Sequence, residues 1–217
     1  MASHYNALAK SLNAGTYKQC FDVKKGVMAN TPEKNTFSQH ASIMGVLSGS
    51  IPAEKVASVM HNLLQDTTLS QATFYYRFYL TQALKKANMA DLYYAQLKPW
   101  RDMLEMGLTT FAENPEPTRS DCHAWSASPN YDLLATVCGI MPGSPHFSTV
   151  IVKPAMGELR QVAATMPHPD GIISVFLERV GVSGIRAEIV LPKTAKGKFI
   201  WNNKTLILKG GMQKVLL

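Results

Sequence analysis

The sequence has few cysteines and no long apolar segment. Its three cysteines, Cys20, Cys122 and Cys138, show no CxxC spacing, and an odd number cannot form a closed disulfide framework. We therefore expect buried thiols. No apolar run approaches the roughly 18 residues that cross a bilayer, and residues 1–6 have neither region of a signal peptide. These absences predict a soluble chain with no membrane partner and no export signal as written.

Motifs that hold cofactors are also missing. The sequence contains no HExxH, P-loop or GxGxxG motif, and its histidines do not have metal-ligand spacing. We therefore expect no cofactor and no metal.

Charge of one sign is not concentrated anywhere. The 22 Lys and Arg outnumber the 15 Asp and Glu, which gives a formal charge of +7 and could suggest a polyanion partner. The longest basic clusters are only pairs, Lys24-Lys25 and Lys85-Lys86, and no aromatic RNA-binding motif accompanies them. The pattern predicts solvated surface charge and no nucleic-acid partner, with polyanion binding kept as a third alternative.

The 217 residues change character near residue 143. Before it, apolar residues recur at helical spacing, and after it short β-branched runs alternate with Gly and Pro. The first part predicts six helices, which would pair as three antiparallel hairpins. They are expected at residues 4–21, 38–47, 70–87, 91–105 and 131–140, with one further helix that starts just after Ser50 and runs to residue 64.

Several local features accompany these helices. Ser50 is a candidate N-cap with Pro52 in the first turn, and Pro99 is expected to kink the fifth helix. Small residues in 38–49 predict close packing against a neighbour. The aromatic residues of 74–79 are expected mainly in the core, with one or two available to line a pocket.

The second part is expected to be all β. Period-two alternation is clear in residues 172–177 and 186–191, and Asn202-Asn203 predicts a tight hairpin turn. A small antiparallel β-sandwich is the economical interpretation, with a marginal core. Strands are expected at residues 148–152, 159–165, 172–179, 186–191, 197–202 and 204–208.

A long loop at residues 107–126 carries the mixture of side chains that polar-ligand sites use. It contains the carboxylates Glu113, Glu116 and Asp121, together with His123 and Trp125. The whole connection between the helices expected at residues 91–105 and 131–140 has about 25 residues, a length that is uncommon in compact domains unless it is functional. Carboxylates transfer protons, a histidine orients a ligand, and an indole stacks on a sugar ring. The alternative is a solvated loop whose tryptophan covers the core.

A second polar cluster opens the helix at residues 38–47. Gln39 and His40 follow a Pro-containing loop and could project toward the same end of the helical part. A hydrogen-bonded structural histidine is the competing interpretation.

These segments together resemble the bacterial α-L-rhamnosidases of glycoside hydrolase family 78 and their six-hairpin relatives. The resemblance covers nearly the whole chain in order, although each motif is short. The matching segments are Thr31-Pro32, Phe37-Ser38-Gln39-His40, Thr109-Thr110-Phe111-Ala112-Glu113, Arg119-Ser120-Asp121-Cys122-His123-Ala124-Trp125-Ser126, Gly139-Ile140 with Pro142, and Met166-Pro167-His168-Pro169.

The resemblance implies a fold of an (α/α)6 barrel followed by a C-terminal β-sandwich. With about six helices where the family has twelve, residues 1–143 would be the C-terminal half of the barrel and residues 144–217 the sandwich. Apolar stripes meant for the absent half would then be exposed, so we expect a homo-oligomer, poor solubility, or association with a complementing N-terminal half.

The resemblance also implies inverting hydrolysis of terminal α-L-rhamnosides by one carboxylic acid and one carboxylate base. Glu113 matches the general base. His123 matches a histidine of the sugar subsite, accompanied by Trp125, Asp121 and Phe111. The general acid would lie upstream, since neither Glu116 nor Asp121 takes its place.

Gln39 and His40 are assigned to the rim of the same site. We expect little or no hydrolysis by this chain alone, because losing one member of an acid/base pair removes a factor of about 10² to 10⁴. The main alternative is a non-catalytic carbohydrate-binding or interaction module. Localisation stays open, with a periplasmic or secreted parent enzyme as one alternative.

Overall fold

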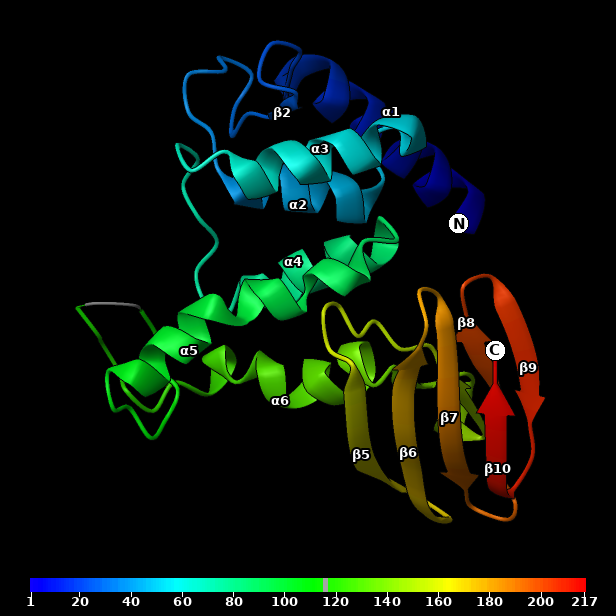
Figure 1. Ribbon diagram of the computed structural model, residues 1–217. Helices are drawn as coiled ribbons and strands as arrows, with labels where there is room; N and C mark the ends of the chain where they lie inside the picture. The colour runs from blue at the N-terminus through cyan, green and yellow to red at the C-terminus, as the bar shows by residue number, and fades with distance from the viewer. Residues whose placement is uncertain (115–116) are drawn as a thin grey trace. The chain divides into compact units, whose positions relative to one another are not determined.

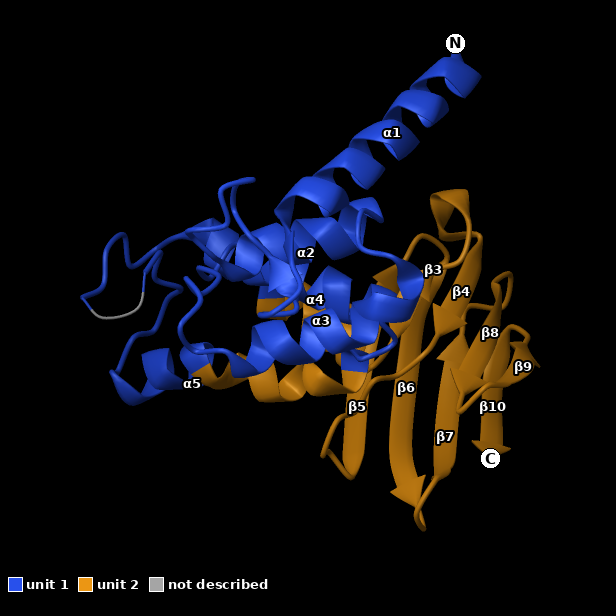
Figure 2. Ribbon diagram, turned by 90° about the horizontal axis from the view of Figure 1, so that it is seen from above, with its two compact units in different colours: residues 1–90, 99–128 blue, residues 91–98, 129–217 orange. Residues whose placement is uncertain are grey.

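The computed structural model describes residues 1–114 and 117–217. These residues form two compact units, which Figure 2 shows in separate colours. Unit 1 comprises residues Met1–Ala90 and Pro99–Ser128, and unit 2 comprises Asp91–Lys98 and Pro129–Leu217. The domain boundary expected between residues 143 and 144 stays a prediction.

Six α-helices lie within the described residues, ahead of the long strands, so the order of α followed by β is as expected (Figure 1). The first part also contains short 3-10 turns and the small pair β1 (Phe21–Asp22) and β2 (Val27–Met28). The helices are α1 (Ala2–Cys20), α2 (Gln39–Ser48), α3 (Ala53–Gln65), α4 (Arg77–Lys86), α5 (Lys98–Glu105) and α6 (Ser128–Asp132).

The core of unit 1 is built by α2, α3 and α4 together with β1 and β2. The small residues of α2 permit close approach, as predicted: a Cβ on Gly45 would lie 2.9 Å from the Ile51 side chain, and Met28 N donates to Ser42 Oγ at 2.9 Å. The buried cluster comprises Phe21, Val27, Met28, Ile43, Val46, Ile51, Val59, Met60, Leu63, Leu69, Ala72, Leu80, Ala83 and Leu84.

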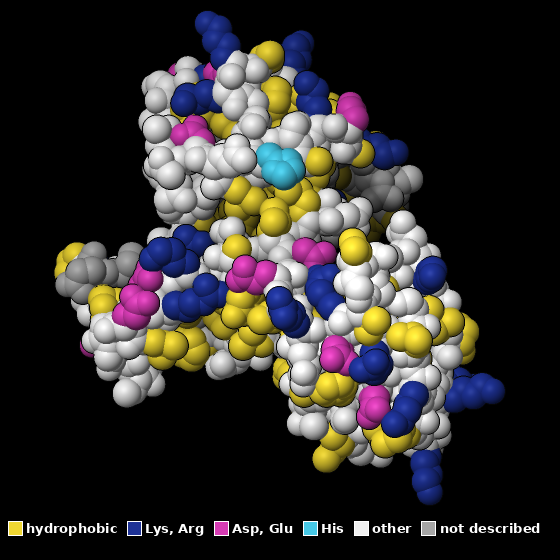
Figure 3. All heavy atoms as spheres, viewed as in Figure 1, with side chains coloured by type: hydrophobic (Ala, Val, Ile, Leu, Met, Phe, Trp, Pro, Cys, Tyr) yellow, Lys and Arg dark blue, Asp and Glu magenta, His cyan; other side chains and the backbone are white. Residues whose placement is uncertain are grey.

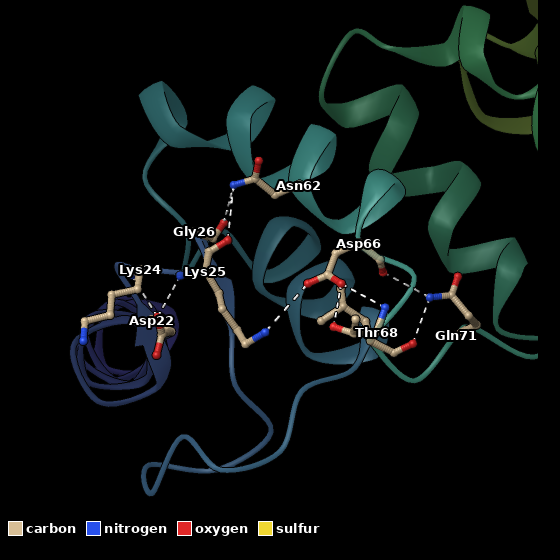
Figure 4. A network of polar contacts seen from close by, with 9 residues as sticks. Asp22, Lys24, Lys25, Gly26, Asn62, Asp66, Thr68 and Gln71 are labelled. Carbon is tan, nitrogen blue, oxygen red and sulfur yellow. Dashed lines mark hydrogen bonds and ion pairs between the residues drawn. The ribbon is translucent and has the colours of Figure 1, made fainter.

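A polar network joins the turn after β1 to the end of α3 (Figure 4). Asp22 Oδ1 accepts hydrogen bonds from the backbone N–H groups of Lys24 and Lys25, both at 2.9 Å. Asn62 Nδ2 donates to Lys25 O at 3.4 Å, and Lys25 Nζ lies 3.9 Å from Asp66 Oδ2. The lysine pair that might have suggested a polyanion site therefore takes part in local structure.

Two helix predictions need correction at their starts. The fourth helix begins at Arg77 and not near residue 70, because backbone groups of this segment bond elsewhere: Ser70 N donates to Phe37 O and Ala72 N donates to Gln39 Oε1. Ser50 does not cap α3, whose N-cap is Pro52. The Ser50 hydroxyl instead donates a hydrogen bond to Asn13 Oδ1 at 2.9 Å.

The helix expected at residues 91–105 is interrupted. Two 3-10 turns, Ala90–Leu92 and Tyr94–Leu97, precede α5. Pro99 lies in the first turn of α5, where backbone N–H groups have no intrahelical partner, so the missing N–H of proline costs no hydrogen bond. Pro99 therefore marks the start of a helix and not the kink that was expected.

The helix expected at residues 131–140 is also different. After α6 the chain forms a π-helical turn, Leu133–Val137, and Ile140 already belongs to strand β3 (Ile140–Pro142). Gly139 has a φ of 72°, and a Cβ there would overlap the backbone of Lys153. Only glycine fits this turn without strain, which is why the helix cannot continue.

Unit 2 contains two four-stranded sheets, with orders β10-β7-β6-β5 and β3-β4-β8-β9. The first is antiparallel throughout, whereas β4 and β8 pair in parallel, so the expectation of purely antiparallel sheets is wrong. The remaining strands are β4 (Thr149–Val152), β5 (Gln161–His168), β6 (Gly171–Val180), β7 (Gly184–Leu191), β8 (Lys196–Trp201), β9 (Lys204–Leu208) and β10 (Gly211–Leu216).

One hydrophobic cluster draws on both sheets of unit 2. It includes Val150 and Phe199 from one sheet and Ile173, Leu177 and Ile189 from the other. The turn at Asn202-Asn203 is confirmed, since both residues have positive φ, at 44° and 65°. Burial on alternate residues of β7 and β8 matches the period-two pattern of the sequence.

The surface charge is dispersed. Figure 3 shows Lys and Arg side chains scattered over the viewed face, several of them beside Asp or Glu. Of the three thiols, Cys138 is buried as expected, but Cys20 is only half-buried and Cys122 is exposed, which corrects the prediction for those two residues. None of the helices in residues 1–114 and 117–217 has both the length and the apolar character needed to cross a membrane.

Candidate functional site

The long loop of unit 1 begins where Gly107 ends α5. Gly107 has a φ of 78°, and Leu108 N donates back to Met103 O at 3.0 Å, which is the usual way in which glycine closes a helix. The far end of the loop is anchored by Trp100, whose indole Nε1 donates to Ser126 O at 2.7 Å. The loop is therefore held at both ends by α5.

Within the loop, residues 110–113 run beside residues 119–123 in the opposite direction. Glu113 N donates to Arg119 O at 3.0 Å and to Ser120 O at 3.2 Å, and His123 N donates to Phe111 O at 2.6 Å. The Thr110 hydroxyl also donates to the carbonyl of Asp121. This pairing brings together the two motifs that carry most of the predicted site residues.

Glu113 forms a two-pronged ion pair with Arg119. Arg119 Nε donates to Glu113 Oε2 at 2.9 Å, and its Nη2 donates to Oε1. This hydrogen bonding is the largest effect and holds the pKa of the Glu113 carboxyl below its ordinary value. Burial opposes it as the next largest effect, and the charges of Arg119 and His123 lower the pKa by smaller amounts. The carboxyl is therefore ionised at neutral pH.

A row of aromatic rings lies beside this loop. We call His40, Tyr76, Tyr75, Trp125 and His123 the aromatic row. Their successive ring centroids are 4.1, 5.9, 5.4 and 6.2 Å apart. The spacing is that of interacting aromatic pairs, so the row connects the start of α2 with the loop.

The exposed members of the row offer ring surface to solvent. Trp125 is 70% exposed and Tyr75 is 39% exposed. His40 is half-buried against Tyr76, and this burial lowers the pKa of His40. At neutral pH His40 is therefore an uncharged ring, suited to packing and hydrogen bonding rather than to ion pairing.

Gln39 lies apart from these exposed groups. Its side chain is 3% exposed, its Nε2 donates to Leu63 O at 2.9 Å, and its Oε1 accepts from Ala72 N at 2.9 Å. Both ends of the amide thus join backbone segments of unit 1, so Gln39 positions the start of α2 beneath His40.

The remaining predicted residues lie on the paired segments. Phe111 is half-buried and Asp121 is exposed, each taking part in the pairing through its backbone carbonyl. Ala112 between Phe111 and Glu113 is fully buried. Glu116 lies outside the described residues.

The sequence did not predict a role for Arg119, although a carboxylate and a guanidinium on either side of the Pro-rich residues 115–117 could have suggested a pair. It placed the aromatic residues of 74–79 mainly in the core, with one or two available to line a pocket. No signal singled out Tyr75 and Tyr76 among them. In the part of the chain that the structure describes, no three His, Cys, Asp or Glu side chains gather as a metal site.

Comparison with protein-family models and with curated protein sequences gave no match. Solved structures do match. A glycoside hydrolase family 78 rhamnosidase from Bacillus sp. GL1 aligns with a TM-score of 0.81 and 23% identity, over 92% of this chain and 23% of that one. The chain shares the fold of part of a rhamnosidase.

Two further rhamnosidases support the same fold. The α-L-rhamnosidase from Aspergillus terreus aligns with a TM-score of 0.81 and 19% identity, over 100% of this chain and 27% of its own. The α-L-rhamnosidase of Streptomyces avermitilis, solved in complex with L-rhamnose, gives a TM-score of 0.79 and 15% identity, over 100% of this chain and 24% of that one. The present chain thus spans about a quarter of the rhamnosidases that it matches.

Proposed function

We propose that the chain is part of an inverting glycoside hydrolase that acts on terminal α-L-rhamnosides. In this proposal it is the C-terminal part, comprising half of an (α/α)6 barrel at residues 1–143 and a β-sandwich at residues 144–217. The observation that carries the proposal is the pairing of residues 110–113 with 119–123, which gathers Glu113, His123 and an exposed indole in a chain with a rhamnosidase fold.

Glu113 is proposed as the general base. A base that takes a proton from water must be ionised before the reaction, and the ion pair with Arg119 supports that state. Its position on a loop, with part of the side chain open to solvent, leaves access for a water molecule. Attack of that water on the sugar from the face opposite to the leaving oxygen gives inversion.

The general acid is proposed to come from residues outside this sequence. Inverting enzymes place the two carboxyl groups about 6.5–9.5 Å apart, so that a water molecule fits between the base and the sugar. Asp121 is on the segment paired with that of Glu113 and, as an exposed side chain, belongs with sugar binding. A complementing N-terminal half would supply the acid as well as the other side of the pocket.

Sugar binding is proposed to use the end of the aromatic row. The exposed face of Trp125 provides a platform for the apolar face of a pyranose, and His123 and Asp121 provide hydrogen-bonding groups for its hydroxyls. Phe111 lines the base of the site, and His40 with Gln39 supports its rim. The chemistry uses carboxyl groups alone, so we propose no metal and no cofactor.

A non-catalytic carbohydrate-binding module is the second candidate. One observation favours it: both carboxylate oxygens of Glu113 accept hydrogen bonds from Arg119, as in a purely structural ion pair. In that case the aromatic row would hold a sugar without cleaving it.

Binding of L-rhamnose to the purified 217-residue chain tests both functions. We expect resonances of the Trp125 indole and of the Glu113 carboxyl to shift in NMR titrations with L-rhamnose, and Glu113→Gln to alter the shifts at this site. The matched control is Glu178→Gln, which removes the carboxylate of another exposed Glu–Arg pair, in unit 2. No shift in the wild-type chain would contradict both candidates.

Hydrolysis gives the second measurement. We expect no release of the aglycone from an aryl α-L-rhamnoside by this chain alone, and release when an upstream half carrying the acid is added. Hydrolysis by the chain alone that Glu113→Gln abolishes would contradict the assignment of the acid to other residues. Unchanged rhamnose binding in Glu113→Gln, with no hydrolysis on complementation, would favour the non-catalytic module.

A further inference from the structure

We propose that Arg119 is a positioning residue, which fixes the direction of the Glu113 carboxylate through a two-pronged hydrogen bond. The inference rests on the proposed role of Glu113 as the base. It gives Arg119 a task distinct from sugar contact: Arg119 acts on the ligand only through Glu113.

The first support is that Glu113 and Arg119 are joined twice. The backbone N–H of Glu113 donates to Arg119 O, and the side chains meet through the guanidinium fork. Ser120, the next residue, has a φ of 54° and its carbonyl also accepts from Glu113 N. The backbone pairing of Glu113 with Arg119 and Ser120 therefore also places the Arg119 side chain against the carboxylate.

The second support is the unequal exposure of the two side chains. The Glu113 side chain is 25% exposed, whereas that of Arg119 is 71% exposed. The carboxylate is thus the enclosed partner, and the guanidinium approaches it from the solvent side. With two of the carboxylate's lone-pair directions used by the fork, the others remain for a water molecule or a sugar hydroxyl.

The third support is the chemistry of the fork. A guanidinium that meets both oxygens of a carboxylate fixes the plane of the carboxylate as well as its charge. An ammonium at the same place would supply charge without fixing the plane, because it acts as a point charge on a flexible stem. Arg119→Lys is therefore informative: it separates orientation from charge.

The first experiment follows the titration of the Glu113 carboxyl by NMR in the full chain. In Arg119→Gln we expect the pKa of Glu113 to move upward, toward that of an ordinary glutamate, since its main hydrogen-bond donor is lost. Arg119→Lys should move it less. The matched control is Arg186→Gln, which breaks the Arg186–Glu178 pair of unit 2 and should leave the Glu113 titration unchanged.

The second experiment measures the affinity of each variant for L-rhamnose. We expect Arg119→Gln to weaken binding by about 1.4- to 5-fold, because the carboxylate loses the fork that fixes its plane. Arg119→Lys should bind as weakly as Arg119→Gln despite its retained charge, because orientation is what the fork supplies. Arg186→Gln should bind as the wild type does.

The outcomes separate this inference from the proposed function. If the wild-type chain shows no response to L-rhamnose, the proposed sugar site fails, and an unmoved Glu113 titration in Arg119→Gln would overturn the positioning role as well. If rhamnose binds but Arg119→Gln has the wild-type affinity, or Arg119→Lys restores it, the positioning role is overturned while the sugar site stands.

Discussion

The two units use their apolar side chains differently. In unit 2 the alternating residues of both sheets meet in one buried cluster, and the exposed apolar residues are dispersed over short helical segments, turns and strands. In unit 1 several of the exposed apolar residues follow a pattern. Tyr5, Leu8 and Leu12 recur along α1, none of whose residues is buried, and the exposed rings of Tyr75 and Trp125 adjoin the site loop.

The contrast is in how far each unit covers its own apolar side chains, which unit 2 does more fully than unit 1. A sheet with its apolar face covered gains nothing further from association, whereas an amphipathic helix with an open stripe gains from any apolar surface that covers it. Each unit has a buried core of its own, but unit 1 also has rows of exposed apolar side chains on α1 and beside the site loop.

The largest expected effect tests that contrast with a pair of leucines. Leu177 is fully buried on β6, and Leu8 on α1 is 45% exposed. Leu177→Ala should lower the free energy of unfolding by about 2–5 kcal/mol, and Leu8→Ala should change it by less than about 0.5 kcal/mol. Urea unfolding measures both. Equal losses would mean that α1 is packed as tightly as the β core.

A pair of glycines gives the next largest effect. Gly139 in unit 2 has positive φ and no room for a Cβ, while a Cβ on Gly15 in α1 would meet nothing within 4 Å. Gly139→Ala should cost about 1–3 kcal/mol, and Gly15→Ala should stabilise by about 0.5–1 kcal/mol through helix propensity. Thermal unfolding followed by circular dichroism checks both signs. A neutral Gly139→Ala would contradict the turn that separates α6 from β3.

These differences also show what the sequence could predict. Period-two alternation located β6 and β7 within a few residues, because each strand packs one face against the core. The parallel pairing of β4 with β8 was not predictable in this way, since alternation is the same for either direction of the neighbour. Strand β10 was missed because its side chains alternate between half-buried and exposed, with no buried position to mark a side that faces the core.

The helical part was harder to predict at its ends. Helix α4 starts seven residues later than residue 70, because long-range bonds to Phe37 and Gln39 hold residues 70–72 extended. Such bonds leave no local pattern. The same limit applied to the candidate site. The residue types in the loop indicated a polar-ligand site, but the Glu113–Arg119 pair depends on backbone pairing that only the structure shows.

The exposed stripe of α1 makes a prediction about association. If this stripe drives self-association, the double variant Leu8→Glu/Leu12→Glu should raise the dissociation constant about tenfold, equivalent to about 1.4 kcal/mol. Light scattering over a range of concentrations measures it. The matched control is Ile207→Glu on β9 of unit 2, where a dispersed apolar residue is 68% exposed. A monomeric wild-type chain would contradict the association expected from this stripe.

The smallest expected effect concerns the pH dependence of unit 1. Burial lowers the pKa of His40 from an ordinary value of 6.5, so below pH 6.5 the unfolded chain takes up a proton that the folded chain does not. Unfolding is then favoured by proton uptake, and stability decreases as the pH falls from about 6.5 toward the lowered pKa of the folded state. His40→Gln should flatten this part of the profile, whereas His61→Gln, at an exposed position of α3, should keep it. Melting temperatures between pH 8 and pH 5 decide the matter: an unchanged slope in His40→Gln would mean that His40 is as accessible to protons in the aromatic row as in the unfolded chain.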